Sequence, residues 1–251
     1  MTGKMNHKYR LVFLWLLIGC VSLLAAASSG PKEENTIERV SSIMRQYELD
    51  VTELPLDVTS TIQKFDLQGK LVSTKKSTHR FEVTESRTGD NSKRTATLGK
   101  VERRSLGELG LADMTALMAS FFFQPQLASS LRFHVEQSEQ DALVSFRTNG
   151  ACESFELSKK GFKLLHWCGE GKVRVDTTAQ LPLEYSFESG GLPLTLGKKE
   201  LRSCRATETF QTVQVEAGRR PFMLPKTVIV TIETEKRKTV ITSHYELHKS
   251  K

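Results

Sequence analysis

The chain is poor in the features that mark several large classes of protein. Among its 251 residues there are only four cysteines and two tryptophans. Its most apolar stretch, Leu11 to Ala27, spans 17 residues, and a membrane-spanning helix usually needs about 20. No run of five or six basic residues occurs, and the formal net charge is +7, so no charge pattern indicates nucleic-acid binding. A hydrophobic content of 38% is nevertheless enough to bury a core.

Motifs for catalysis and for metal binding are also absent from the sequence. There is no His-Glu-x-x-His or Cys-x-x-Cys spacing for zinc, no Gly-x-Ser-x-Gly nucleophile turn, and no phosphate-binding glycine loop. Only His244 and His248 stand four residues apart, and they fall in a predicted strand and its tail. We therefore expect no metal, no cofactor and a protein that is not an enzyme.

The N-terminus has the layout of a secretory signal peptide. Lys4, Lys8 and Arg10 precede the apolar stretch, and Ala25-Ala26-Ala27 supplies the small residues of a cleavage site. We expect residues 1–27 to be removed. The remainder, residues 28–251, would then be a single exported domain, periplasmic or secreted, with no transmembrane span.

Two alternatives remain for this segment. An uncleaved anchor would be short for a membrane span. Leu17-Ile18-Gly19-Cys20 resembles the lipobox of bacterial lipoproteins, which would make Cys20 the lipidated N-terminus and associate the protein with the outer membrane. Residues 21–27 stay largely apolar, however, whereas a mature lipoprotein turns polar directly after its cysteine. Cleavage after Ala27 is therefore favoured.

Two helices and about ten strands are predicted for the rest of the chain. Apolar residues at helical spacing predict a helix over 36–47 with Asn35 as its cap. An almost wholly apolar helix is predicted over 111–123 and ends before Pro125. Besides the cysteine-flanked segment below, strands are predicted over 59–64, 70–84, 93–100, 131–136, 142–147, 172–176, 183–188, 200–215, 227–233 and 239–247. This excess of strands predicts an α+β fold, in which an antiparallel sheet keeps one face in water and packs the other on the helices.

The segment CESFELSKKGFKLLHWC, residues 152–168, predicts a stapled hairpin. A three-residue loop at 159–161 sets a register that pairs Glu153 with Trp167, Phe155 with Leu165, and Cys152 with Cys168. Directly opposed strand residues have Cα atoms about 4.5–5.5 Å apart, which suits a disulfide. Because export would expose the chain to oxidation, we expect a Cys152–Cys168 disulfide. The rival pairing joins Cys168 to Cys204.

In its overall layout the chain resembles the bacterial periplasmic lipoprotein-carrier and outer-membrane lipoprotein-receptor class. NTIERVSSIMRQYELDVTE, from residue 35, is similar to its opening helix. GKVRVDTTAQLPLEYSFE, from residue 171, resembles its strand–turn–strand, and MLPKTVIVTIETEKRKTVITSHYEL, from residue 223, its closing strands. The resemblance implies a half-open barrel of about ten strands, whose concave side is plugged by the N-terminal and central helices and binds an acyl chain or another apolar ligand.

Two functions are expected on this basis. The first is an exported binding protein that shelters a lipid or a lipid-modified protein, without catalytic residues. Its candidate lining residues are Met118, Phe121, Phe122, Phe123, Phe155, Leu165 and Trp167; ordinary core packing is the alternative role for the three consecutive phenylalanines. The second is an envelope structural, interaction or sensor protein without a small ligand, which contacts other envelope proteins through its sheet edges.

Overall fold

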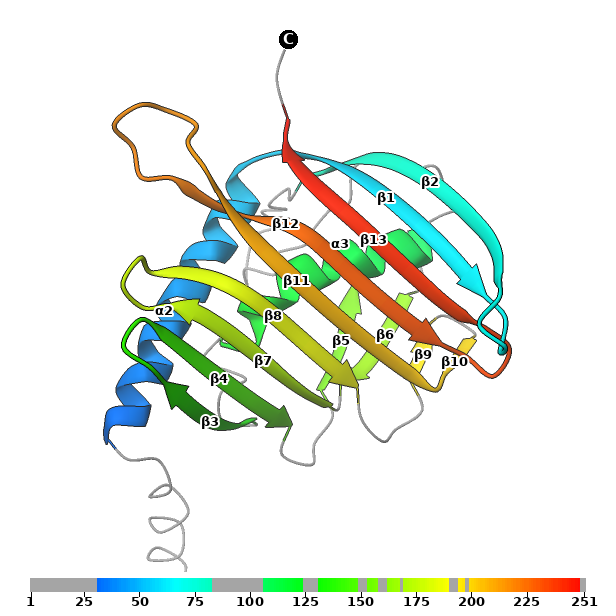
Figure 1. The fold of residues 1–251 in the computed structure, drawn as a ribbon, viewed down its shortest axis with the longest axis horizontal. Coiled ribbons are helices and arrows are strands. Elements are labelled where there is room, and N and C mark those ends of the chain that lie inside the picture. The colour runs from blue at the N-terminus through cyan, green and yellow to red at the C-terminus, as the bar shows by residue number, and fades with distance from the viewer. Residues whose placement is uncertain are drawn as a thin grey trace, which may run out of the picture.

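A large, curved antiparallel sheet with helices on one face dominates the computed structural model (Figure 1). The structure describes residues 31–82, 106–123, 131–148, 153–157, 162–167, 169–189, 194–196 and 199–248. In chain order its elements are α2 (Pro31–Glu53), β1 (Leu56–Phe65), β2 (Leu71–Phe81), α3 (Leu106–Phe121), β3 (Leu131–Gln137), β4 (Asp141–Thr148), β5 (Glu153–Leu157), β6 (Phe162–Trp167), β7 (Gly169–Asp176), β8 (Leu181–Ser189), β9 (Leu194–Leu196), β10 (Lys199–Leu201), β11 (Ser203–Val213), β12 (Phe222–Glu233) and β13 (Lys238–Leu247).

Nine strands form the large sheet in the order β2-β1-β13-β12-β11-β8-β7-β4-β3. The first strand therefore lies beside the last, with Leu56 opposite Leu247. The outer strands β2 and β3 are not joined, so the sheet is open, and the predicted α+β half-barrel is confirmed. Four short strands form a second sheet in the order β10-β9-β6-β5. The strand predicted over 93–100 lies outside the described residues.

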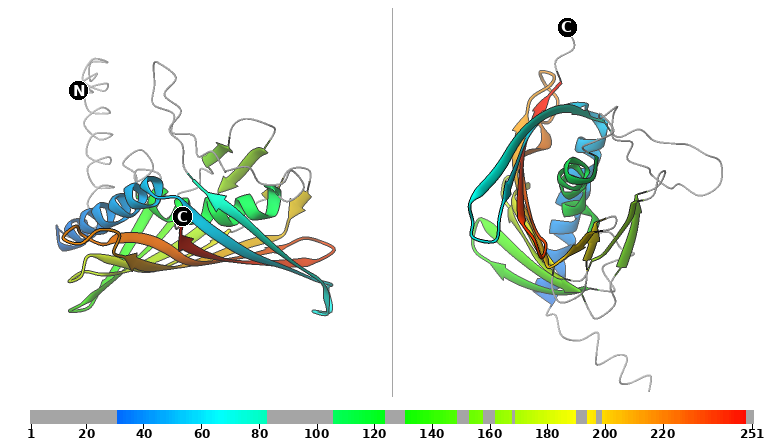
Figure 2. Two further views of the ribbon diagram at one scale, coloured as in Figure 1. Left: turned by 90° about the horizontal axis from the view of Figure 1, so that it is seen from above. Right: turned by 90° about the vertical axis from the view of Figure 1, so that its right-hand side faces the viewer.

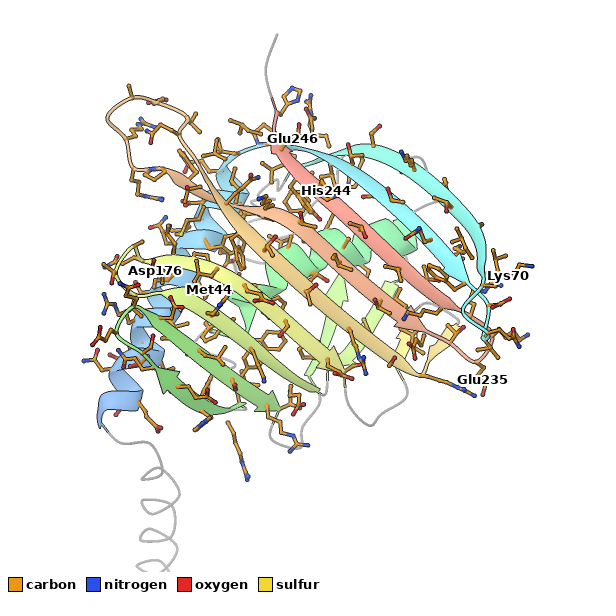
Figure 3. The ribbon with its side chains drawn as sticks, in the orientation of Figure 1. Met44, Lys70, Asp176, Glu235, His244 and Glu246 are labelled. Atoms are coloured by element: carbon orange, nitrogen blue, oxygen red, sulfur yellow. The ribbon has the colours of Figure 1, made fainter. Side chains whose placement is uncertain are left out.

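The helices cover one face of the large sheet and leave the other in water (Figure 2). On β12, Val228, Val230 and Ile232 are buried. On β13, Ile241 and Tyr245 are buried on the same side, whereas His244 and Glu246 are exposed on the outer side (Figure 3). The expected alternation of a dry and a wet face is thus confirmed.

Helix α2 is longer than predicted and is fixed to the sheet by a buried carboxylate. It begins at Pro31, a residue that suits the first turn of a helix, so the prediction that Asn35 caps it is wrong. Its apolar stripe is buried as expected. Near its end, the fully buried Asp50 accepts hydrogen bonds from the Arg220 guanidinium, with Nη1–Oδ2 at 2.8 Å, and from the backbone N–H of Met223. This charge-assisted fork joins α2 to the β11–β12 hairpin.

Helix α3 approaches the sheet closely because its buried side includes small residues. Ala112, Ala116 and Ala119 are all fully buried, and their spacing places them along one side of the helix. The helix starts five residues before the predicted position and ends at Phe121. Phe122 and Phe123 therefore follow the helix in a turn instead of extending it.

The cysteine-flanked segment forms the predicted hairpin, β5 and β6, but with a bulge. Glu153 pairs with Trp167 as expected. Phe155 pairs with Leu164, so the prediction of Leu165 as its partner is wrong. Near the turn, Leu157 pairs with Phe162, which is one residue off the predicted register. An irregularity between Ser154 and Phe155 shifts the pairing by one residue, so that the predicted register holds again at Glu153. Cys152 and Cys168 lie outside the described residues.

Candidate site on the concave face of the large sheet

Aromatic side chains fill one end of the concave face. The aromatic cluster consists of Phe122 and Phe123 after α3, Phe133 on β3, Phe146 on β4, and Tyr185 and Phe187 on β8. The Phe122 ring stacks on Phe187 with centroids 5.5 Å apart and lies 4.6 Å from Phe146. Such pairs stabilise a core beyond the area that they bury. Glycine at 171 keeps room for one of these rings, since a Cβ there would stand 2.3 Å from Phe146.

A carboxyl and a hydroxyl lie buried at the border of this cluster. Glu208 on β11 is directly paired with Tyr185 on β8, so the two side chains project side by side from the same face. Both residues are fully buried. Among the described residues, neither Oε2 of Glu208 nor the hydroxyl of Tyr185 has a hydrogen-bond partner. Buried polar atoms are nearly always paired in proteins, so this pair requires an explanation.

Hydrogen-bond counting indicates that Glu208 is a neutral acid. The Tyr47 hydroxyl lies 2.7 Å from the carbonyl oxygen of Ala116 and 2.5 Å from Oε1 of Glu208. A phenol carries one proton and a carbonyl oxygen only accepts. If Tyr47 donates to Ala116, the second contact needs a proton that belongs to Glu208. Burial acts in the same direction, because it raises the pKa of the Glu208 carboxyl well above its ordinary value.

Burial also keeps the neighbouring hydroxyl and thiol protonated. Burial, with the Glu208 carboxyl nearby, raises the pKa of Tyr185 well above its ordinary value. Cys204 lies on the same side of β11 and is a free, buried thiol, whereas Cys168, its partner in the rival disulfide, lies outside the described residues. Burial raises the pKa of Cys204 to about 12. A thiol that stays protonated is a weak nucleophile, and Cys204 therefore acts here as a small core residue.

A second polar group holds α3 at the other end of the face. Asp113 on α3 is buried, and its Oδ2 lies 2.7 Å from Nε2 of His79 on β2. Its Oδ1 accepts a hydrogen bond of 2.9 Å from the hydroxyl of Tyr245 on β13. Asp113 thus fixes α3 to β2 and β13. The hydrogen bond from the Tyr47 hydroxyl to the carbonyl oxygen of Ala116 fixes α3 to α2. Nδ1 of His79 is buried without a partner among the described residues.

The predicted lining residues fall into separate places. Phe122 and Phe123 are brought together in the aromatic cluster at 3% and 2% exposure. Met118 and Phe121 belong to α3, but the structure does not describe their side chains. Phe155, Leu165 and Trp167 belong to the second sheet, on β5 and β6, and again only their backbone is described. Whether any of the seven contacts a ligand stays a prediction, and Cys20 lies outside the described residues.

Sequence reasoning missed the polar residues of the site. A signal existed for Glu208, because it follows Cys204 and Ala206 at every second position of a strand, on a face that is otherwise apolar. No comparable signal marks His79, which stands in the polar run LVSTKKSTHRF. Its partner Asp113 is 34 residues away in sequence, in a different element.

Two negative findings bear on the type of site. Within the described ranges, no three His, Cys, Asp or Glu side chains gather in a group that could hold a metal ion. In the same part of the chain, no helix combines the length and the apolar character that crossing a bilayer requires.

Comparison with known proteins adds a distant structural likeness. No model of a protein family matches this sequence, and no curated protein matches it. Fifteen chains of solved structures match. One of them is a LolA superfamily protein from Nitrosomonas europaea, with a TM-score of 0.31 and 10% sequence identity over 84% of this chain and 94% of that chain. A likeness at this TM-score and identity supports neither a shared ligand nor a shared activity.

Proposed function

We propose that the chain is an exported, non-catalytic binding protein that shelters an apolar, lipid-type ligand on the concave face of its large sheet. The observation that supports this best is the buried Glu208–Tyr185 pair. Oε2 of Glu208 and the hydroxyl of Tyr185 have no partner among the described residues. Ligand sites are mostly apolar surfaces with a few well-placed polar groups. The aromatic cluster and this pair together have that composition.

The proton count at Tyr47 suggests which polar group the ligand carries. If the Glu208 proton is used toward Tyr47 through Oε1, then Oε2 is left as an acceptor. The neighbouring Tyr185 hydroxyl is left as a donor. One donor beside one acceptor complements a neutral group that has both, such as an amide or a hydroxyl. An attached acyl chain would add about 0.8 kcal/mol for each buried methylene.

In the proposed mode, the acyl chain shares the aromatic cluster with α3. Apart from its apolar packing, the described contacts of α3 to the rest of the protein include the Asp113 hydrogen bonds and the Ala116 carbonyl. The Asp113 contacts lie at the β13–β2 end of the concave face, the Ala116 contact lies beside Glu208, and the phenylalanine rings after the helix lie at the β3–β8 end. Binding would therefore exchange ring contacts of Phe122 for ligand contacts, while the polar end of α3 stays in place.

A pair of tyrosine variants tests this proposal. The probe is a fluorescent stearamide, displaced by unlabelled oleamide. Because the Tyr185 hydroxyl has no partner among the described residues, Tyr185→Phe should leave the free energy of unfolding unchanged or raised and should weaken probe binding about tenfold. Tyr245→Phe is the matched control: its hydroxyl is bonded to Asp113, so it should lower stability without changing the affinity of the folded protein. Equal probe affinity in wild type and Tyr185→Phe would contradict the proposal.

The alternative function, an envelope interaction protein without a small ligand, is supported by the two open strand edges, β2 and β3. Native mass spectrometry separates the two roles. The ligand-binding role predicts a bound lipid mass that is lost on denaturation. Absence of both a lipid mass and stearamide binding would favour the interaction role.

Export and the Cys152–Cys168 disulfide are part of the same proposal, and each is tested by a separate measurement. The mass of the mature protein should correspond to cleavage after Ala27, whereas lipidation would add acyl mass at Cys20. Non-reducing peptide mapping should recover a peptide that links Cys152 to Cys168. The paired Glu153 and Trp167 support this register, because they are the positions adjacent to the cysteines. Recovery of both thiols in alkylated form would contradict the disulfide.

A further inference from the structure

The β1–β2 hairpin ends in an apolar tip that the core does not use. We define the hairpin tip as residues 65–72, between the end of β1 and the start of β2. Leu67 is 64% exposed, Leu71 48% and Val72 66%. These are three of the six large apolar residues that the structure describes as exposed, and they fall within six consecutive positions. Single exposed apolar residues are ordinary on protein surfaces, but a group at one projecting end indicates a contact surface.

Basic side chains surround this tip. Lys70 is exposed within it, and the adjacent β12–β13 turn contributes the exposed Lys236, Arg237 and Lys238. Lys238 is paired with Phe65 across the β13–β1 ladder, so the two hairpin ends are neighbours. Figures 1 and 3 show both at the same end of the large sheet, where Lys70 and Glu235 are labelled. We call these four cations the basic rim.

Asp66 and Glu235, two of the acidic residues at this end, are engaged with nearby groups. Oδ1 of Asp66 accepts the backbone N–H groups of Gln68 and Lys70 and so closes the turn. Glu235 forms an ion pair of 3.7 Å with Arg202. Gly69 adopts a φ of +80°, which the tight turn requires. The turn is therefore a built feature that presents Leu67 and Leu71 outward.

Edge protection explains the lysines of β2 but not its apolar residues. Lysines on an outer strand commonly prevent edge-to-edge pairing, and Lys75 and Lys76 are exposed on such a strand. Leu71 and Val72 would promote that pairing instead. A narrow apolar tip with a positive rim complements an anionic bilayer surface, where apolar side chains enter the headgroup boundary and cations meet lipid phosphates.

We propose that the hairpin tip and its basic rim dock the protein on the surface of an anionic phospholipid bilayer. A partner protein would have to cover about 800 Å² on each side for a standard interface, which exceeds what three side chains at a narrow tip offer. This proposal concerns the outside of the molecule and does not depend on the ligand site of the concave face.

Vesicle sedimentation of the full chain tests the proposal. The vesicles contain phosphatidylglycerol and phosphatidylcholine, or phosphatidylcholine alone. The tip variant is Leu67→Ser/Leu71→Ser/Val72→Ser, and the matched control is Leu49→Ser/Val215→Ser/Ile229→Ser, whose residues are 47%, 40% and 39% exposed elsewhere. Residues 1–30 are common to all proteins, so only differences between them are compared. We expect the tip variant to bind anionic vesicles about tenfold more weakly than the wild type and the control.

A charge variant and a salt series complete the test. Lys236→Gln/Arg237→Gln should weaken binding to anionic vesicles and leave binding to phosphatidylcholine unchanged. Raising the salt from about 0.05 M to about 0.5 M should reduce the effect of this variant, because salt screens exposed charges. The proposal is overturned if tip variant, control and wild type bind alike. It is also overturned if the wild type self-associates through the tip, seen as a dimer that the tip variant loses, without tip-dependent vesicle binding.

Discussion

The two ends of the concave face are held by different forces. At the β3–β8 end, six aromatic rings pack on one another around Phe146, and the contacts are apolar and without fixed direction. At the β13–β2 end, α3 is held by directional hydrogen bonds: Oδ1 of Asp113 accepts from the Tyr245 hydroxyl, and its Oδ2 lies within hydrogen-bond distance of Nε2 of His79. One helix and the turn after it therefore contact both kinds of surface.

Two of the three unpartnered buried atoms lie between these two ends. The phenylalanine rings have no polar group to satisfy, and both carboxylate oxygens of Asp113 have hydrogen-bond partners. Glu208 and the Tyr185 hydroxyl lie between these regions, and there only Oε1 of Glu208 has a partner, the hydroxyl of Tyr47. The border therefore holds two of the three buried side-chain atoms that lack a partner among the described residues, and the third, Nδ1 of His79, lies at the Asp113 end. A ligand group that carries both a donor and an acceptor would find both partners at the border.

The largest effect should come from deleting a ring at the aromatic end. Phe146 is buried at 2% exposure and contacts Phe122, Phe123, Phe133 and Tyr185. We expect Phe146→Ala to lower the free energy of unfolding by about 3–5 kcal/mol, through lost burial and the cavity left behind. Urea unfolding measures the change, and the exposed Leu49→Ala should shift it by less than about 0.5 kcal/mol. A loss below about 1 kcal/mol for Phe146→Ala would mean that the rings are loosely packed.

A smaller loss is expected from removing the carboxylate at the polar end. Asp113→Ala leaves Nε2 of His79 and the hydroxyl of Tyr245 without their described partner in a buried region. We expect it to lower the free energy of unfolding by about 2–3 kcal/mol. Asp113→Asn keeps one acceptor oxygen and should cost less.

A double-mutant cycle shows whether this loss is due to the hydrogen bond. If Tyr245 and Asp113 interact as described, Tyr245→Phe should cost less in the Asp113→Ala background than in the wild type, by about 1 kcal/mol. Strict additivity of the two changes would show that α3 is held by its apolar packing alone, and the two ends would then not differ in kind.

The contrast between the ends also separates what the sequence could predict from what it could not. The alternation of Val228, Val230 and Ile232 is a local pattern, and the strand predicted over 227–233 is present within β12. Strand order is not local: the pairing of Leu56 with Leu247 depends on how the whole sheet closes. The predicted register of β5 with β6 is correct at Glu153 but wrong on the other side of the bulge. The alternation of side chains along a strand does not reveal where a bulge inserts an extra residue.

The polar site was invisible for a related reason. Phe122 and Phe123 were named as candidates because they stand in an almost wholly apolar run, whereas Phe133, Phe146 and Phe187, on separate strands, were not named. A carboxylate is ordinarily taken as solvent-exposed, so Glu208 was recognisable only by its place among Cys204 and Ala206 on one strand face. Its partner Tyr47 lies 161 residues away, on a helix. Such pairs become apparent only when the strand order is known.

At pH 4, the smallest change in stability is expected for Glu208→Gln at the border. A neutral Glu208 and a glutamine have nearly the same shape and can both donate to Tyr47, so the two proteins should agree within about 1 kcal/mol. Above the ordinary pKa of 4.5 they should diverge. The unfolded wild type then loses the Glu208 proton while the folded wild type keeps it, so the unfolded state binds fewer protons and wild-type stability falls as the pH rises.

Relative to the wild type, Glu208→Gln should therefore gain about 1.4 kcal/mol of unfolding free energy per pH unit above 4.5, until the raised pKa of the folded protein is reached. Urea midpoints from pH 4 to pH 8, compared as the difference between the two proteins, remove the contributions of the other ionisable groups. Tyr47, Tyr185 and Cys204, which surround the carboxyl, keep their protons in this range because burial raises the pKa of each. A difference that does not change with pH would mean that Glu208 ionises as easily in the folded chain as in the unfolded one. The border between the rings and the hydrogen bonds would then be open to water, and the donor–acceptor pair would present a charge to the ligand.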